Sequence, residues 1–137
     1  MTLRPDQKQR YLRHVLLLGP GAQERLLAAS VAIDDAAGAG AAALLYLAAA
    51  GVGTLVVRDA RTVAPEDVGL VYEIGDVGRP RAAAAAERIA ALNPDVRVVG
   101  AGDAAHRVPP MMSTCDADAL ARGAAAAGAI VRLVGGA

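Results

Sequence analysis

Two kinds of apolar segment alternate along the chain. Short runs rich in β-branched residues occur at Ser30–Ile33, Thr54–Arg58 and Val96–Val99, a pattern typical of buried strands. Longer alanine- and leucine-rich segments at residues 40–50 and 81–92 have the length and composition of helices. Strands that alternate with helices favour right-handed crossovers, and therefore a parallel sheet covered by helices.

The segments around these elements are less regular. Residues 6–17 have apolar side chains near helical spacing and predict a helix that ends at Gly19-Pro20-Gly21, and residues 22–29 predict a second short helix. Residues 60–80 contain closely spaced proline and glycine and predict irregular structure.

The C-terminal part carries a further helix and strand in this interpretation. Residues 100–112 have little periodicity, and Pro109-Pro110 excludes a helix there. Residues 116–127 predict a helix that ends at Gly128, and the apolar run Ile130–Val134 predicts a fourth strand.

Length and composition narrow the class of protein. With 137 residues, we expect one domain over 1–137, made of an N-terminal helical segment (1–29) and a βαβ core (30–137). Lysine plus arginine and aspartate plus glutamate balance at 14 each, which argues against nucleic acid and anionic membranes as partners. The single cysteine, Cys115, excludes an internal disulfide and a cysteine-cluster metal site. No apolar stretch is long enough to span a membrane, so we expect a cytoplasmic protein.

The loop after the first predicted strand contains the candidate chemistry. Residues 38–43 fit the loose G-x-G-x-x-A pattern of dinucleotide-binding loops, and Asp59 ends the next strand, where it could meet a ribose hydroxyl. Glycines are also common wherever a strand turns tightly into a helix. Asp34 and Asp35 precede the loop, where a carboxylate about 5 Å from a phosphate costs about 3 kcal/mol at an effective dielectric near 20. We favour the interpretation that Asp34 and Asp35 cap the following helix, and so supply the anion from within the chain, over a metal-binding or catalytic role for them.

A longer resemblance concerns four segments: RYLRHVLLLG (10–19), YLAAAGVGTL (46–55), DVGRP (76–80) and ALNPDVRVV (91–99). In order and spacing they resemble the ThiF/MoeB family of adenylating enzymes, which includes the ubiquitin-activating enzymes. The resemblance covers residues 4–99, and residues 115–137 resemble a shortened form of the next helix and strand. It implies a Rossmann-like three-layer α/β fold with a mostly parallel sheet, truncated relative to the full-length family. It also implies ATP and magnesium as the reagents that adenylate the C-terminal Gly-Gly of a carrier protein.

Matching the family's motifs to this chain gives candidate nucleotide-binding residues. They are Gly38 and Gly40 in the loop, Asp59 at the strand end, Arg81 where the family has lysine, and Arg13 on the N-terminal helix. In dimeric family members, the arginine matched by Arg13 reaches into the neighbouring molecule's ATP site. The alternative for Arg13 is a solvated side chain on an amphipathic helix.

At several positions this sequence differs from the motifs of the ThiF/MoeB family. Asp35 and Ala37 replace the first two glycines of the family loop, Arg61 replaces an acid, and Leu70 replaces a phosphate-contacting arginine. Asp116 and Asp118 are the candidates for the magnesium-binding aspartate.

These departures favour a pseudoenzyme with no catalytic residue, no metal site and no expected cofactor. We expect it to bind itself, a homologous active adenylating subunit or a ubiquitin-like carrier. The first alternative is a minimal ATP- and magnesium-dependent adenylyltransferase that uses Gly38, Gly40, Asp59 and Arg81. The second is a binding module for another nucleotide or dinucleotide.

Overall fold

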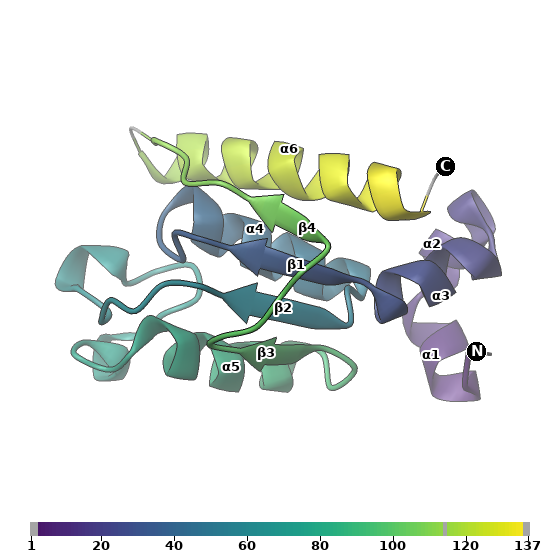
Figure 1. Ribbon diagram of the computed structural model, residues 1–137, viewed down its shortest axis with the longest axis horizontal. Helices are drawn as coiled ribbons and strands as arrows, with labels where there is room; N and C mark the ends of the chain where they lie inside the picture. The colour runs from purple at the N-terminus through teal and green to yellow at the C-terminus, as the bar shows by residue number, and fades with distance from the viewer. Residues whose placement is uncertain (1–2, 114, 136–137) are drawn as a thin grey trace.

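The computed structural model describes residues 3–113 and 115–135. Three short helices come first, followed by a region of alternating strands and helices (Figure 1). In chain order, the helices and strands are α1 (Pro5–Arg10), α2 (Leu12–Leu18), α3 (Pro20–Ala28), β1 (Ser30–Ile33), α4 (Ala39–Ala50), β2 (Thr54–Val57), α5 (Arg81–Leu92), β3 (Arg97–Val99), β4 (His106–Val108) and α6 (Asp116–Gly135). Two 3₁₀ turns, η1 (Pro65–Asp67) and η2 (Ile74–Asp76), lie between β2 and α5.

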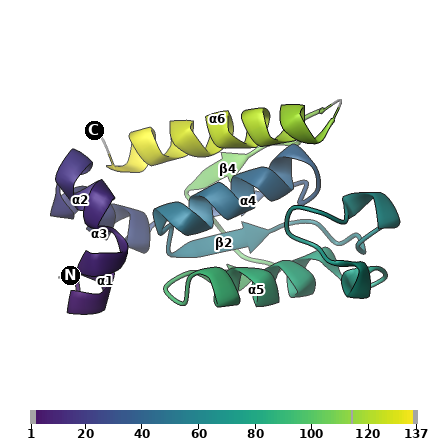
Figure 2. The same cartoon turned by 180° about the vertical axis from the view of Figure 1, so that it is seen from behind.

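The four strands form one parallel sheet in the order β3-β2-β1-β4. Helices α4 and α5 cover one face of this sheet, and α6 lies beside α4 along the β4 edge (Figure 2). The β3–β4 connection crosses the opposite face (Figure 1), where Arg58 Nη2 donates to the carbonyl oxygen of Gly102 at 2.8 Å. The predicted α/β class and parallel sheet are confirmed.

The hydrophobic core lies between the sheet and its helices. Alternate strand residues Val31 and Ile33 of β1 and Leu55 and Val57 of β2 are fully buried in it. This alternation follows from the two-residue period of a strand, which turns every second side chain to the same face. The central helix α4 is buried on nearly every side, because the sheet, α5 and α6 all surround it.

The first predicted helix is interrupted. At Tyr11 the backbone leaves helical geometry (φ −105°, ψ 21°), and α1 and α2 separate there. The Tyr11 side chain is buried and its hydroxyl donates to Asp95 Oδ2 at 2.8 Å, while Asn93 Nδ2 donates to that hydroxyl at 2.8 Å. These contacts with the segment after α5 replace the continuity that the spacing predicted.

Two predictions in the C-terminal part were wrong. Residues 106–108, expected to have little order, form strand β4 at the sheet edge, and the run 130–134, expected to be a strand, lies inside helix α6. Helix α6 continues through Gly128 because its small buried residues Ala119, Gly123 and Ala127 recur every fourth position and pack against α4. Within the described residues no helix is both long and apolar enough to cross a membrane.

Candidate functional site

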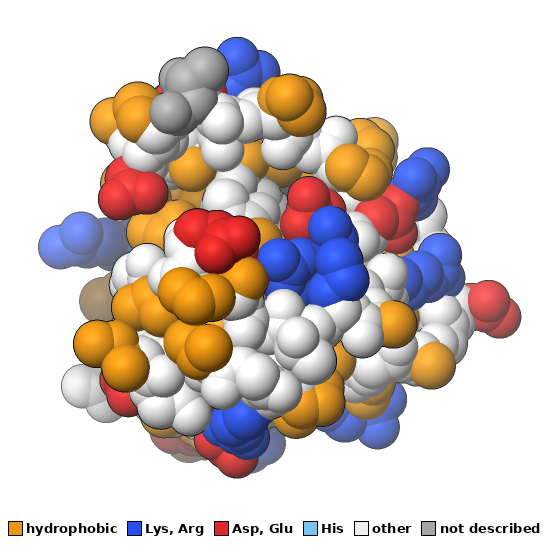
Figure 3. All heavy atoms as spheres, turned by 90° about the vertical axis from the view of Figure 1, so that its left-hand side faces the viewer, with side chains coloured by type: hydrophobic (Ala, Val, Ile, Leu, Met, Phe, Trp, Pro, Cys, Tyr) orange, Lys and Arg blue, Asp and Glu red, His pale blue; other side chains and the backbone are white. Residues whose placement is uncertain are grey.

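The candidate site lies where the carboxyl ends of the parallel strands meet. The β1–α4 loop (residues 34–38) and the long β2–α5 segment (residues 58–80) converge at this edge. Crevices outside the carboxyl ends of parallel strands are the usual ligand sites of open α/β sheets. Figure 3 views this edge directly and shows basic side chains at its centre with acidic side chains beside them.

The two candidate glycines are required by the loop's own path. A Cβ atom on Gly40 would lie 1.6 Å from the Asp35 carbonyl oxygen, so no other residue fits without moving the backbone. Gly38, the N-cap of α4, has φ 56°, a conformation that side chains other than glycine rarely adopt. Both glycines therefore shape the strand-to-helix turn, and they need no ligand to account for them.

Asp59 is at the centre of a buried hydrogen-bonded cluster. Its side chain is 1% exposed. Its Oδ2 accepts the backbone N–H of Ala36 at 2.9 Å and Arg81 Nη1 at 2.8 Å, and its Oδ1 accepts Arg61 Nε at 2.8 Å. Both carboxylate oxygens are thus engaged within the chain. A ribose hydroxyl could bind Asp59 only by displacing one of these donors.

Arg81 links that cluster to η1. Its Nη2 donates to Asp67 Oδ2 at 2.8 Å, while Nη1 also lies 3.5 Å from Asp35 Oδ1. The Arg81 side chain is 8% exposed, and its Nε is buried with no hydrogen-bond partner among the described residues. An unsatisfied buried donor of this kind marks a place where a further acceptor would be favourable.

The electrostatics of the cluster favour the ionised form of Asp59 and the neutral form of Tyr72. Burial alone raises the pKa of Asp59, but the hydrogen bonds from Arg61, Ala36 and Arg81 outweigh it and hold this pKa well below its ordinary value. Burial raises the pKa of Tyr72, whose hydroxyl donates to the Ala36 carbonyl oxygen at 2.6 Å. Asp59 and Tyr72 therefore both hold Ala36, which fixes the start of the loop.

The expected capping by Asp34 and Asp35 was wrong. The N-cap of α4 is Gly38, and no side chain caps it. Asp35 instead accepts the N–H of Ala37 at 3.2 Å, before the helix begins, and Asp34 pairs with Arg107 of β4. The two carboxylates stabilise the loop and the sheet edge rather than the first turn of the helix.

Ion pairing also changes the predicted repulsion of phosphate. Asp35 lies 3.2 Å from Arg61 Nη2, in addition to its approach to Arg81. Asp35, Asp59 and Asp67 contribute three negative charges and Arg61 and Arg81 two positive ones, so this cluster has a formal charge of 2 − 3 = −1. The estimate of repulsion from the sequence assumed unpaired carboxylates and therefore overstated the effect.

A cavity of about 310 Å³ lies beside the cluster. Gly38 and Ala41, at the start of α4, form one side of it. Glu66, Asp67 and Leu70 of the β2–α5 segment and Asp116 of α6 also line it. The cavity thus meets the N-terminal end of a 12-residue helix, where backbone N–H groups and the helix dipole favour anions.

The two candidates for the magnesium-binding aspartate, Asp116 and Asp118, lie at different places on α6. Asp116 lines the cavity, whereas Asp118 pairs with Arg122 one turn further along α6, at 3.0 Å. No three histidine, cysteine or acidic side chains of the described residues are grouped so as to hold a metal ion alone. Magnesium is commonly held by one or two carboxylates together with substrate phosphates, so the donors around this cavity fit a nucleotide-bound ion.

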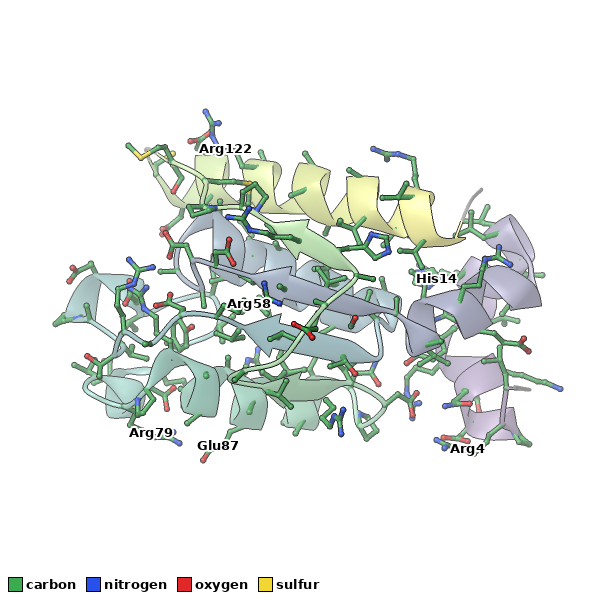
Figure 4. All side chains as sticks on the ribbon, in the orientation of Figure 1. Arg4, His14, Arg58, Arg79, Glu87 and Arg122 are labelled. Atoms are coloured by element: carbon green, nitrogen blue, oxygen red, sulfur yellow. The ribbon has the colours of Figure 1, made fainter. Side chains whose placement is uncertain are left out.

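Arg13, the fifth candidate nucleotide-binding residue, lies far from the other four. Arg13 is an exposed residue of α2, and α2 is at the opposite end of the sheet from the strands' carboxyl ends (Figure 1). His14, next to it, is labelled among the N-terminal helices in Figure 4. Gly38, Gly40, Asp59 and Arg81 therefore share one edge, and Arg13 does not join them within one molecule.

Sequence reasoning did not single out two members of the site. Asp67 pairs with Arg81, and Tyr72 holds the loop through Ala36. Both come from the irregular β2–α5 segment, where no periodicity fixes the direction of a side chain. Arg61 could have been found from its position two residues after Asp59, whose carboxylate its guanidinium contacts.

The geometry defines a Rossmann-like domain with a cavity of about 310 Å³ at its carboxyl edge, and comparison with known proteins identifies its family. The ThiF family model matches residues 11–121, and the chain belongs to this family. The SAMP-activating enzyme E1 of Haloferax volcanii is 45% identical over 104 residues, which are 72% of this chain and 38% of that protein. The sulfur carrier protein adenylyltransferase of Thermus thermophilus is 42% identical over 97 residues, 68% of this chain and 36% of that protein.

A solved structure supports the same fold. The Escherichia coli tRNA N6-threonylcarbamoyladenosine dehydratase TcdA superimposes with a TM-score of 0.73 over 97% of this chain and 59% of that one, at 21% identity. At this identity the likeness concerns the fold alone. The chain spans less than two fifths of the length of each of the two relatives named above.

Proposed function

We propose that this chain binds a magnesium nucleotide in the cavity beside Gly38 and contributes to adenylating the C-terminal carboxylate of a sulfur carrier or ubiquitin-like protein. The observation that carries the proposal is the cavity's position, at the N-terminus of α4 and the carboxyl edge of the sheet. Membership of the ThiF family and the adenylyltransferase named among the relatives support this reaction.

In this proposal, some residues of the site bind the phosphates and the magnesium ion, and others hold the loop and the charged side chains in place. Gly38 and the first turn of α4 offer backbone donors to a phosphate, and Asp116 is placed to share a magnesium ion with the phosphates. Arg81 supplies a guanidinium that contacts the cavity lining, because it pairs with Asp67. When bound, magnesium would offset the negative charge that the phosphates and the acidic lining share. Asp59 holds the loop and the arginines in place.

Carrier-dependent exchange of labelled pyrophosphate into ATP tests this function. The reaction forms an acyl-adenylate and releases pyrophosphate, so its reverse incorporates the label only when the carrier carboxylate has been activated. We expect exchange with magnesium and a carrier ending in Gly-Gly, and none when the last glycine is removed. If ATP and the carrier are saturating and no exchange is detected, the adenylating function is wrong.

A second candidate is the non-catalytic partner favoured by the sequence. It is supported by the engagement of both Asp59 oxygens and of Arg81 within the chain, and by Leu70 at a position where the family has arginine. A chain of this kind would bind an active adenylating subunit and raise its rate without supporting exchange itself. Exchange by the active subunit, with and without this chain, distinguishes the two candidates.

Association with a second molecule fits either candidate. The α2 helix exposes Leu16 and Leu17, the latter at 82%, at the end of the molecule remote from the cavity. Burying such side chains is favourable in an interface. We propose that α2 contacts a second copy or a homologous subunit, and that Arg13 on the same helix meets that molecule's site.

A further inference from the structure

The charges around the cavity are unusually one-sided for a polyphosphate site. Three carboxylates line it, from Glu66, Asp67 and Asp116, and the lining itself includes no cationic side chain among the described residues. Arg81, whose side chain is 8% exposed, contacts this lining through Asp67. The availability of the Arg81 charge therefore decides how well this cavity accepts a polyanion.

Asp67 holds that charge firmly. Its side chain is 7% exposed, and its Oδ2 accepts both Arg81 Nη2 and the backbone N–H of Ala64, each at 2.8 Å. The second contact closes the η1 turn, so the carboxylate is fixed in place by its own segment. An ion pair so little exposed to water is weakly screened and competes strongly with an incoming phosphate.

Arg81 is nevertheless incompletely satisfied. Its Nη1 and Nη2 groups have acceptors, but its buried Nε has none among the described residues. If Nη2 exchanged Asp67 for a phosphate oxygen, Arg81 would keep its contact with Asp59, and its new acceptor would not be shared with the Ala64 N–H. An exchange of this kind at Nη2 would therefore leave Arg81 with as many acceptors as it has now.

We propose that Asp67 is an affinity-determining residue of the nucleotide site, which withholds Arg81 from phosphate and so weakens the binding of polyphosphate nucleotides. The inference rests on the proposed function for the location of the site. It predicts that replacing the Asp67 carboxylate by a neutral group strengthens binding, and more so for ATP than for AMP, because the Arg81 charge acts on the phosphate chain.

The test measures the affinity of Asp67→Asn for magnesium ATP, magnesium ADP and AMP by isothermal titration calorimetry. We expect ATP to bind at least tenfold more tightly than to the unaltered chain, because at an effective dielectric near 20 the removal of one like charge has this effect at any separation up to about 12 Å. AMP should gain less. Asp67→Ser is a second variant that lacks the carboxylate, and its hydroxyl can still accept the Ala64 N–H. Thermal denaturation shows which of the variants fold.

Two matched variants separate this effect from others. Glu66→Gln removes a negative charge from the same cavity without touching Arg81. Asp76→Asn removes the equivalent cap of η2, where Asp76 accepts the Glu73 N–H at 2.9 Å and pairs with Arg79 at 2.8 Å, away from this cavity. Glu66→Gln should gain less than Asp67→Asn, and Asp76→Asn should leave the affinity unchanged.

The outcomes separate this inference from the proposed function. If the folded Asp67 variants bind ATP no better than the unaltered chain or Glu66→Gln, the role of Asp67 is overturned, whatever the exchange assay gives. If they bind more tightly and the unaltered chain shows no carrier-dependent exchange, Asp67 has the proposed role and the adenylating function fails.

Discussion

Asp59 is the side chain on which the candidate site depends most directly, because it connects the β1–α4 loop, Arg61 and Arg81. Its pKa is lower in the folded protein than in the unfolded chain, so its stabilising effect is complete above the unfolded value of about 4. As the pH falls below about 4 the unfolded chain binds the proton first, and this stabilisation is progressively lost.

We therefore predict that Asp59→Asn lowers the free energy of unfolding at pH 7 by about 3 kcal/mol, since it leaves two arginines without their shared carboxylate. The loss should be smaller at pH 3, where the native carboxylate contributes less. Urea denaturation at both pH values measures it. Asp103→Asn, at an exposed aspartate, is the control and should change neither value. An equal loss for Asp59→Asn at pH 7 and pH 3 would contradict the linkage.

At the scale of single residues, the sequence identified most of the residues that lie at the candidate site. The β1–α4 loop, Asp59 and Arg81 contact one another at one edge of the sheet, because the ends of neighbouring parallel strands meet there. The sequence did not predict which acidic and basic side chains of the site form ion pairs. The Arg81–Asp67 and Arg61–Asp35 contacts depend on the path of the β2–α5 segment, which has no repeating pattern from which a side-chain direction follows.

Helix α6 shows how small residues set the distance between elements. Gly123 faces α4 so closely that a Cβ atom would lie 2.5 Å from Ala42 Cβ and 2.6 Å from the Ala39 carbonyl oxygen. We predict that Gly123→Ala forces the helices apart and lowers stability by about 1–3 kcal/mol. The change is measured by thermal or urea denaturation.

Gly128, five residues further along the same helix, is the matched control. Its Cβ would meet nothing nearer than the end of the Arg132 side chain at 3.4 Å. Gly128→Ala should therefore raise stability by about 0.5–1 kcal/mol, because alanine restricts the unfolded chain and favours helix. A loss of stability in Gly128→Ala would indicate that the helix ends there after all.

The errors in predicting elements have a common cause. The run 130–134 has the β-branched composition of a strand, but its place in the fold is decided upstream by the four-residue spacing of Ala119, Gly123 and Ala127, which continues the helix. The strand β4 (His106–Val108) is only three residues long and includes an exposed arginine. It exists because β1 offers a free edge, and that information is absent from the segment itself.

At the scale of the whole molecule, the two ends have different characters. The cavity and its acidic lining lie at the carboxyl edge of the sheet, and the N-terminal helices, with the exposed leucines of α2, lie at the other end. Arg13 can therefore contribute to a nucleotide site only in a second molecule. In a symmetric dimer each α2 would meet the partner's carboxyl edge, so each site would need both chains.

This arrangement is tested by mixing two inactive variants. Arg13→Ala should remove carrier-dependent exchange, and Leu70→Trp should block the cavity while leaving α2 unchanged. In an equal mixture that re-equilibrates, half of the dimers pair one variant with the other. Each of those holds one complete site, so exchange should recover to about a quarter of the unaltered rate. Lys8→Ala, at an exposed lysine of α1, is the control and should be active alone. Full activity of Arg13→Ala by itself, or no recovery on mixing, would show that the site is completed within one chain or by another group.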